Sequence, residues 1–82
     1  MINAEPTPEM VRGLITKTFA IPSGELADDT ALFSSGRLDS FHLVELIAAL
    51  EKTSGRRILP GEVNLDNLDS PRRIAALLAT KV

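Results

Sequence analysis

Cysteine, tryptophan and tyrosine are absent from this chain of 82 residues, which has only three phenylalanines and one histidine, His42. Without cysteine, the chain cannot form disulfides, thiolate zinc sites or cysteine nucleophiles. One histidine also rules out a histidine metal cluster within a single chain. Because aromatic residues are scarce, we expect a core of aliphatic side chains. Catalysis by the chain alone and a bound metal are therefore not expected.

Long hydrophobic runs are missing as well. No apolar run approaches the ~18 residues needed to span a bilayer. The N-terminal segment, residues 1–6, has neither the basic nor the apolar region of a secretory signal peptide. We therefore expect a cytoplasmic protein with no membrane insertion.

Charge of one sign is not in large excess. Nine basic and eleven acidic residues give a net charge of −2, which argues against a nucleic-acid partner. The hydrophobic content of 44% and the charged content of 24% are those of a globular chain. We expect one domain over residues 1–82, with residues 1–6 as a flexible N-terminus, and a monomer.

The spacing of apolar residues predicts an all-α fold: a small four-helix bundle with three main helices and a short third helix. The first helix should begin with Thr7 as N-cap and Pro8 at its first position, and end before Pro22. Its buried face comprises Val11, Leu14, Ile15, Thr18 and Phe19.

The segment over residues 22–38 is longer than most connections, and loops of that length are usually functional or disordered. We expect this loop between helices one and two to be ordered. Burial of its apolar residues would tie it to the bundle; these are Leu26, Leu32, Phe33 and Leu38.

A second helix should run from Asp39-Ser40 to about Thr53, with Gly55 as its stop. At ~100° per residue, its core face is formed by Leu43, Leu46, Ile47 and Leu50. A second, mostly apolar stripe lies nearly opposite, formed by Phe41, Val44, Glu45 and Ala48. Such a stripe either packs on a local element or meets a partner.

The stretch over residues 58–68 fits short helical turns, and a last helix should start with Ser70 as cap and Pro71 at its first position. Its buried residues are Ile74, Leu77 and Leu78. Arg72 and Arg73 in its first turn oppose the helix dipole. We therefore expect them to pair with acidic neighbours, namely Glu62, Asp66 or Asp69.

Ser40 is the residue most suited to carry chemistry. At the start of a helix its hydroxyl meets the positive end of the dipole and unpaired backbone N–H groups, which favours an anionic group such as a phosphate ester. A nucleophile would need a positioned base. His42 lies about 200° around the helix from Ser40 and so faces away from it. An Asp-Ser pair before a helix can equally be only a cap.

The wider pattern resembles the acyl carrier protein family over nearly the whole chain. Its most specific part is Asp39-Ser40 with Glu45-Leu46 five and six residues after the serine. The other matching residues are Leu32-Phe33, Gly36, Leu38, Phe41, Val44, Leu50-Glu51 and the short third helical segment. The resemblance implies that a phosphopantetheinyl transferase attaches 4′-phosphopantetheine to Ser40, and that acyl groups are carried as thioesters on its thiol.

Within that family the chain is most similar to free-standing carriers of amino acids, typified by D-alanyl carrier proteins. The resemblance lies in Gly36 four residues before the serine, in Ile58-Leu59-Pro60 and in Ser70-Pro71. His42 stands where fatty-acid carriers often have an acidic residue, and Arg56-Arg57 interrupt their usual negative charge.

The resemblance implies a non-enzymatic carrier that is loaded by a separate ATP-dependent ligase and unloaded by a downstream acceptor or transferase. The motif and partner-recognition residues are expected to be Leu38, Asp39, Phe41, Val44 and Glu45, with Glu51 a weaker candidate. Phe41 and Val44 could also cover the third helical segment, which does not exclude docking, and both glutamates could be merely solvated. We interpret His42 as a surface residue and both arginine pairs as solvated or locally paired.

Other functions remain open at this point. The carrier could bear fatty-acyl, polyketide or peptidyl groups instead of an amino acid. A helical interaction or nucleic-acid-binding domain, with Ser40 only a cap, would use the arginine pairs and the second apolar stripe. A small hydrolase using Ser40 is disfavoured because no base faces the serine.

Overall fold

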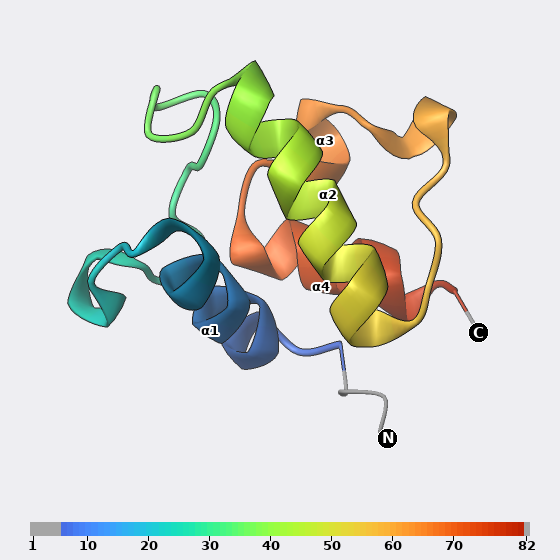
Figure 1. The fold of residues 1–82 in the computed structure, drawn as a ribbon, viewed down its shortest axis with the longest axis horizontal. Helices are drawn as coiled ribbons and strands as arrows, with labels where there is room; N and C mark the ends of the chain where they lie inside the picture. The colour runs from blue at the N-terminus through green and yellow to red at the C-terminus, as the bar shows by residue number, and fades with distance from the viewer. Residues whose placement is uncertain (1–5, 82) are drawn as a thin grey trace.

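The computed structural model describes residues 6–81, and all regular structure within them is helical (Figure 1). In chain order the elements are α1 (Pro8–Phe19), a 3₁₀ turn (Ser23–Glu25), α2 (Ser40–Ser54), a second 3₁₀ turn (Pro60–Glu62), α3 (Leu65–Leu68) and α4 (Pro71–Ala79). The predicted small helical bundle, with three main helices and a short third one, is confirmed. Except for Pro6, the segment expected to be a flexible N-terminus lies outside the described residues.

Local capping explains where α1 and α4 begin. The hydroxyl of Thr7 accepts a hydrogen bond from the Met10 N–H at 3.1 Å, and the hydroxyl of Ser70 accepts one from the Arg73 N–H at 3.1 Å. Each cap is followed by a proline, whose fixed φ and missing N–H suit the first helical position. The helix starts at Thr7-Pro8 and Ser70-Pro71 are therefore confirmed.

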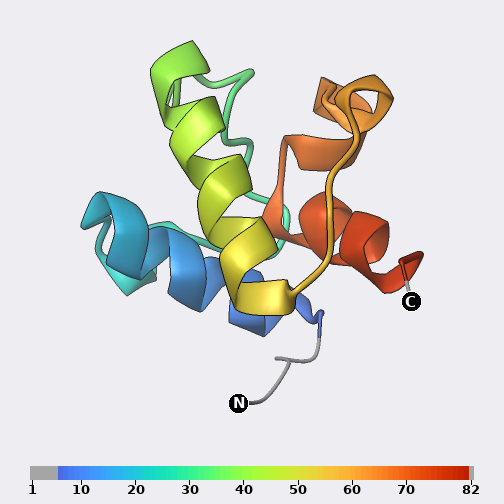
Figure 2. The same cartoon turned by 45° about the vertical axis from the view of Figure 1, so that its right-hand side comes forward.

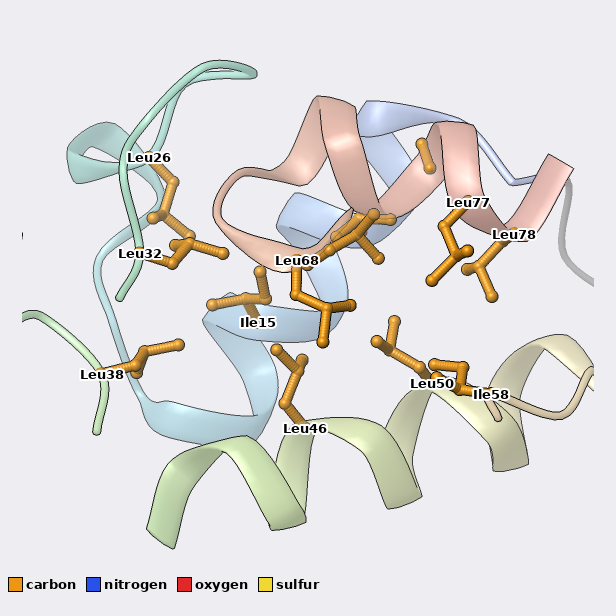
Figure 3. Packing of buried hydrophobic residues seen from close by; sticks show 13 residues of the cluster. Ile15, Leu26, Leu32, Leu38, Leu46, Leu50, Ile58, Leu68, Leu77 and Leu78 are labelled. Carbon is orange, nitrogen blue, oxygen red and sulfur yellow. The ribbon is translucent and has the colours of Figure 1, made fainter. Parts of the chain in front are cut away.

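The helices share one aliphatic core, in which α1 packs against α2 and α4, and α4 also packs against α3. Figure 3 shows Ile15 of α1, Leu46 of α2 and Leu68 of α3 converging on the same interior. Leu50 points toward the α4 residues Leu77 and Leu78 in that view. All six side chains are buried, as expected for a chain with few aromatic residues.

The long connection from α1 to α2 is ordered, as predicted. Leu26, Leu32 and Leu38 are buried in the core, and Phe33 is half-buried against it. The connection is also tied to α4 through its backbone, because the Arg72 N–H donates to the Asp28 carbonyl at 2.8 Å. The ordered loop therefore fixes the position of the backbone at the start of α2.

The partners of the two arginines in α4 were predicted only in part. Arg73 lies 3.6 Å from the carboxylate of Asp66, as expected, whereas Arg72 contacts Asp29 of the long loop at 2.7 Å. Because that hydrogen bond holds Asp29 beside a cation, it lowers the pKa of the aspartate. The other two expected partners are engaged elsewhere: Glu62 pairs with Lys81 and Asp69 binds the loop at Phe33 and Ser34.

Candidate functional site

Ser40 is the first residue of α2, and its side chain is exposed. The capping group of this helix comes from Asp39, whose Oδ1 accepts hydrogen bonds from the N–H groups of Phe41 at 3.0 Å and His42 at 3.1 Å. Within residues 6–81, no hydrogen bond involves the Ser40 hydroxyl. Ser40 is therefore not the cap of α2, and its hydroxyl is free to be modified.

The other serines with described side chains differ from Ser40 in this respect. Ser34 and Ser35 are exposed, but the Ser34 hydroxyl donates to Asp69 at 2.7 Å and that of Ser35 donates to the Ala31 carbonyl at 2.7 Å. Ser54 and Ser70 are buried, and both of their hydroxyls make hydrogen bonds. Exposure, a free hydroxyl and a helix N-terminus coincide at Ser40.

Asp39 remains ionised at neutral pH. Hydrogen bonds from the backbone N–H groups of His42 and Phe41 lower the pKa of its carboxyl below the ordinary value, although partial loss of hydration opposes the shift. A charged capping carboxylate also interacts favourably with the positive end of the α2 dipole. The cap thus holds the first turn of α2 in place and leaves Ser40 unengaged.

His42 is more than the solvated surface residue that the sequence suggested. Its Nδ1 accepts a hydrogen bond from the Asp39 N–H at 3.2 Å, which completes a reciprocal capping box with the Asp39 carboxylate. Its ring also meets Phe19 of α1 edge-on, with 5.3 Å between the ring centroids. His42 therefore ties the start of α2 to α1. Since its Nδ1 is committed to the Asp39 backbone, no base among the described residues is directed at Ser40.

A pocket of about 340 Å³ opens beside Ser40, between the N-terminal half of α2 and the α3 segment, which face each other in Figure 2. The volume lies near the lower end of the ~300–1,000 Å³ range of small-molecule sites. Its wall is predominantly apolar, being formed by Phe33, Leu38, Leu43, Val63, Leu65 and Leu68, with Asp39, Ser40 and Asn64 adding polar atoms. A group attached to Ser40 would have apolar surface within reach.

The predicted recognition residues separate into buried and exposed ones. Leu38 is buried and lines the pocket, whereas Phe41 is 85% exposed and Val44 is 70% exposed. Glu45 is also exposed, and it lies on the outer side of α2 with Phe41 and Val44. These three residues, called here the outer face of α2, lack cover from any described residue, so the alternative that Phe41 and Val44 cover the third segment is wrong.

Glu51 has a structural role. Its Oε2 accepts a hydrogen bond from the Ile58 N–H at 2.8 Å, across the turn at Gly55 where φ is 72°. This contact fixes the chain as it leaves α2 and lets Ile58 enter the core. Glu51 therefore has a local partner, unlike Glu45.

Asp69 holds the loop that precedes Ser40, a role that no short-range pattern in the sequence indicates. Its Oδ1 accepts from the N–H groups of Phe33 at 2.8 Å and Ser34 at 3.0 Å, and its Oδ2 accepts from the Ser34 hydroxyl at 2.7 Å. Burial raises the pKa of the Asp69 carboxyl, but these hydrogen bonds outweigh that effect and lower it below the ordinary value. The loop before Ser40 is thus bound to an ionised carboxylate.

Residues 6–81 contain no cluster of three or more acidic or histidine side chains arranged to hold a metal ion. No helix among them combines the length and apolar character needed to cross a membrane.

The chain is similar to known proteins over most of its length. Residues 9–78 match the family described as "Phosphopantetheine attachment site". Over 54 residues, 66% of this chain and 68% of the relative, the sequence is 35% identical to the D-alanyl carrier protein of Abiotrophia defectiva. It is 49% identical over 61 residues to the lincomycin biosynthesis protein LmbN of Streptomyces lincolnensis, of whose length the match spans 22%.

Proposed function

Because this chain belongs to the phosphopantetheine attachment-site family, a family of carrier proteins, we propose that Ser40 is its attachment residue and that its cargo is an amino acid. Members of the family bind 4′-phosphopantetheine covalently on a serine. The observation that carries the assignment is the exposed and unbonded hydroxyl of Ser40 at the capped start of α2. Every other serine with a described side chain has its hydroxyl engaged.

The surroundings of Ser40 suit an attached phosphopantetheine group. The phosphate would lie at the positive end of the α2 dipole, a position that stabilises negative charge. The apolar pocket beside the serine offers a surface for the less polar parts of the arm or of the cargo. When bound, phosphopantetheine supplies a thiol that holds an acyl group as a thioester, a function that a chain without cysteine cannot provide itself.

The described residues around Ser40 include no group that would activate its hydroxyl, so other proteins must perform the chemical steps. Nothing among the described residues is placed to activate the Ser40 hydroxyl, since Nδ1 of His42 accepts from the Asp39 backbone. A separate transferase must therefore take the hydroxyl proton. The serine oxygen then bonds to the pantetheine-side phosphorus of coenzyme A, and the pyrophosphate bond breaks to release adenosine 3′,5′-bisphosphate. We propose that the chain is not an enzyme, and that a ligase and a downstream acceptor carry out the later steps in the cytoplasm, where coenzyme A and ATP are available.

The outer face of α2 is our proposed docking surface for these enzymes. Phe41 and Val44 offer apolar contact close to Ser40, and Glu45 adds a negative charge that a basic partner would recognise. Each partner must also release the carrier after its step, so a small surface with rapid dissociation suits the function.

The attachment residue can be tested by incubating the purified chain with an active phosphopantetheinyl transferase and coenzyme A. Intact mass spectrometry should show the addition of one phosphopantetheine group, and Ser40→Ala should remain unmodified. Ser35→Ala is a control, because it removes the hydroxyl of another exposed serine five residues earlier in the chain and should still gain one phosphopantetheine group. Absence of modification of the unaltered chain would exclude the proposal.

The cargo proposal is supported by the D-alanyl carrier protein among the relatives. The apolar pocket favours a second candidate, a fatty-acyl, polyketide or other nonpolar acyl group, since such a chain could enter it beside Ser40. An aminoacyl cargo and a nonpolar acyl cargo should differ in their effect on the pocket. A nonpolar acyl group on the modified protein should slow hydrogen exchange around Leu65 and Leu68 and raise the melting temperature, whereas a small polar aminoacyl group should leave both nearly unchanged.

A further inference from the structure

The loop that precedes Ser40 is held by a residue far along the chain. Asp69 accepts three hydrogen bonds through its carboxylate from Phe33 and Ser34, which lie 36 and 35 residues earlier. Its backbone carbonyl accepts a fourth from the Leu32 N–H at 2.7 Å. Three consecutive loop residues are thus fixed to one aspartate.

These contacts define the path of the chain into α2. The Leu38 N–H donates to the Leu32 carbonyl at 2.8 Å, and the Gly36 N–H donates to the Phe33 carbonyl at 3.0 Å, where Gly36 has a φ of 82°. The loop therefore closes on itself between Leu32 and Leu38, directly before Asp39. The exposed residues of this closed loop, 34–37, end three residues before Ser40 in the chain.

Asp69 also joins the two walls of the pocket. Phe33 and Leu38 form the wall that belongs to the loop, and Leu65 and Leu68 form the wall that belongs to α3. Asp69 directly follows Leu68 and is the C-cap of α3, with its own N–H bonded to the Leu65 carbonyl at 3.1 Å. Its position relative to both walls is therefore fixed.

We propose that Asp69 is a positioning residue for the attachment of phosphopantetheine, an assignment that rests on the proposed role of Ser40. Asp69 keeps the loop in the conformation that the transferase meets, so the enzyme does not have to order the loop when it binds. Loss of the carboxylate should raise the KM for this chain and leave kcat nearly unchanged. We expect about a tenfold rise, the scale set by ordering one backbone residue.

The experiment measures kcat and KM for the chain as substrate of a phosphopantetheinyl transferase with coenzyme A, together with a melting curve for each variant. Asp69→Ala removes the three side-chain hydrogen bonds and should show the raised KM. Asp69→Asn should restore a value close to that of the unaltered chain. Its amide oxygen can still accept from both N–H groups, and its NH₂ can donate to the Ser34 hydroxyl. Asp66→Ala is the matched control, because Asp66 lies three residues earlier in α3 and faces solvent.

The pattern among the variants decides the proposal. An unchanged KM in Asp69→Ala would overturn it, as would a fall in kcat alone or equal KM values for the Ala and Asn variants. If Asp69→Ala does not fold, Ser34→Ala takes its place. That variant loses one of the three side-chain hydrogen bonds. It should raise KM by roughly twofold to threefold, which corresponds to part of the net free energy of one hydrogen bond. No change in KM would again overturn the proposal. Failure of the unaltered chain to be modified would instead refute the role of Ser40.

Discussion

Replacing Val44 with aspartate tests whether the outer face of α2 meets the loading enzyme. Val44 is 70% exposed, so the substitution leaves no cavity and buries no charge. Surface substitutions of this kind usually change the free energy of unfolding by within ~0.5 kcal/mol. The aspartate would nevertheless remove an apolar contact and place a charge at the centre of the proposed docking surface, which should lower kcat/KM for loading about tenfold.

Leu46→Asp introduces the same charge at a buried position of α2, so its stability can be compared with that of Val44→Asp. Leu46 is fully buried on the opposite side of the same helix, and the change loses ~1.5–3 kcal/mol of apolar burial in addition to burying an unpaired charge. The total should exceed ~4 kcal/mol, against a stability of ~4–12 kcal/mol for a domain of this size. This variant should melt far below the unaltered chain.

The assay is the loading rate of the already modified Val44→Asp protein at several carrier concentrations, recorded beside its melting curve. Ala76→Asp is the matched control, since it adds the same charge to an exposed position of α4. It should be loaded normally despite a cost in helix propensity of ~0.7 kcal/mol. Normal loading of Val44→Asp together with a large loss of stability would refute the assignment of this residue to a docking surface.

Four other variants test further parts of the structure. Glu51→Ala should lower the free energy of unfolding by about 1–3 kcal/mol because the Ile58 N–H loses its acceptor, whereas Glu45→Ala should slow loading and leave the denaturation midpoint unchanged. Gly36→Ala should cost about 1–2 kcal/mol in a urea titration, since the φ of 82° is strained for alanine while no atom lies within 4 Å of the added Cβ. Hydrogen bonding lowers the pKa of the folded Asp69 carboxyl, so its contribution to stability is complete well above the unfolded value of 3.8 and is lost as the pH falls through the folded value. The difference in melting temperature between the unaltered chain and Asp69→Asn should therefore shrink from pH 6 to pH 3. A constant difference would contradict this expectation.

Short-range signals made much of this fold predictable from sequence. Thr7-Pro8, Asp39 and Ser70-Pro71 define helix starts through contacts within three residues, and Gly55 ends α2 with a left-handed φ. The i, i+3, i+4 spacing of apolar residues in α2 was enough to separate Leu46 on the core side from the outer face. Such patterns need no knowledge of the tertiary structure.

Contacts between distant segments were not predictable in the same way. Arg72 pairs with Asp29, which lies 43 residues earlier, and Asp69 binds the loop 35 and 36 residues earlier. A sequence shows only which acidic residues are near the arginines in the chain, so Asp66 was among the candidates for Arg73 and the partner of Arg72 was missed. His42 was missed for another reason: a capping box usually has Glu or Gln at the third helical position, and histidine is not part of that signature.

The identity of the group on Ser40 in the living cell is the measurement that tests the central claim most directly. The chain should be isolated from its native cells under conditions that preserve thioesters, digested, and examined by mass spectrometry for the peptide that contains Ser40. We predict that this peptide bears phosphopantetheine and that a fraction of it carries an additional acyl group, an amino acid, that hydroxylamine removes. A Ser40 peptide that is wholly unmodified, in cells whose other carrier proteins are modified, would contradict the account.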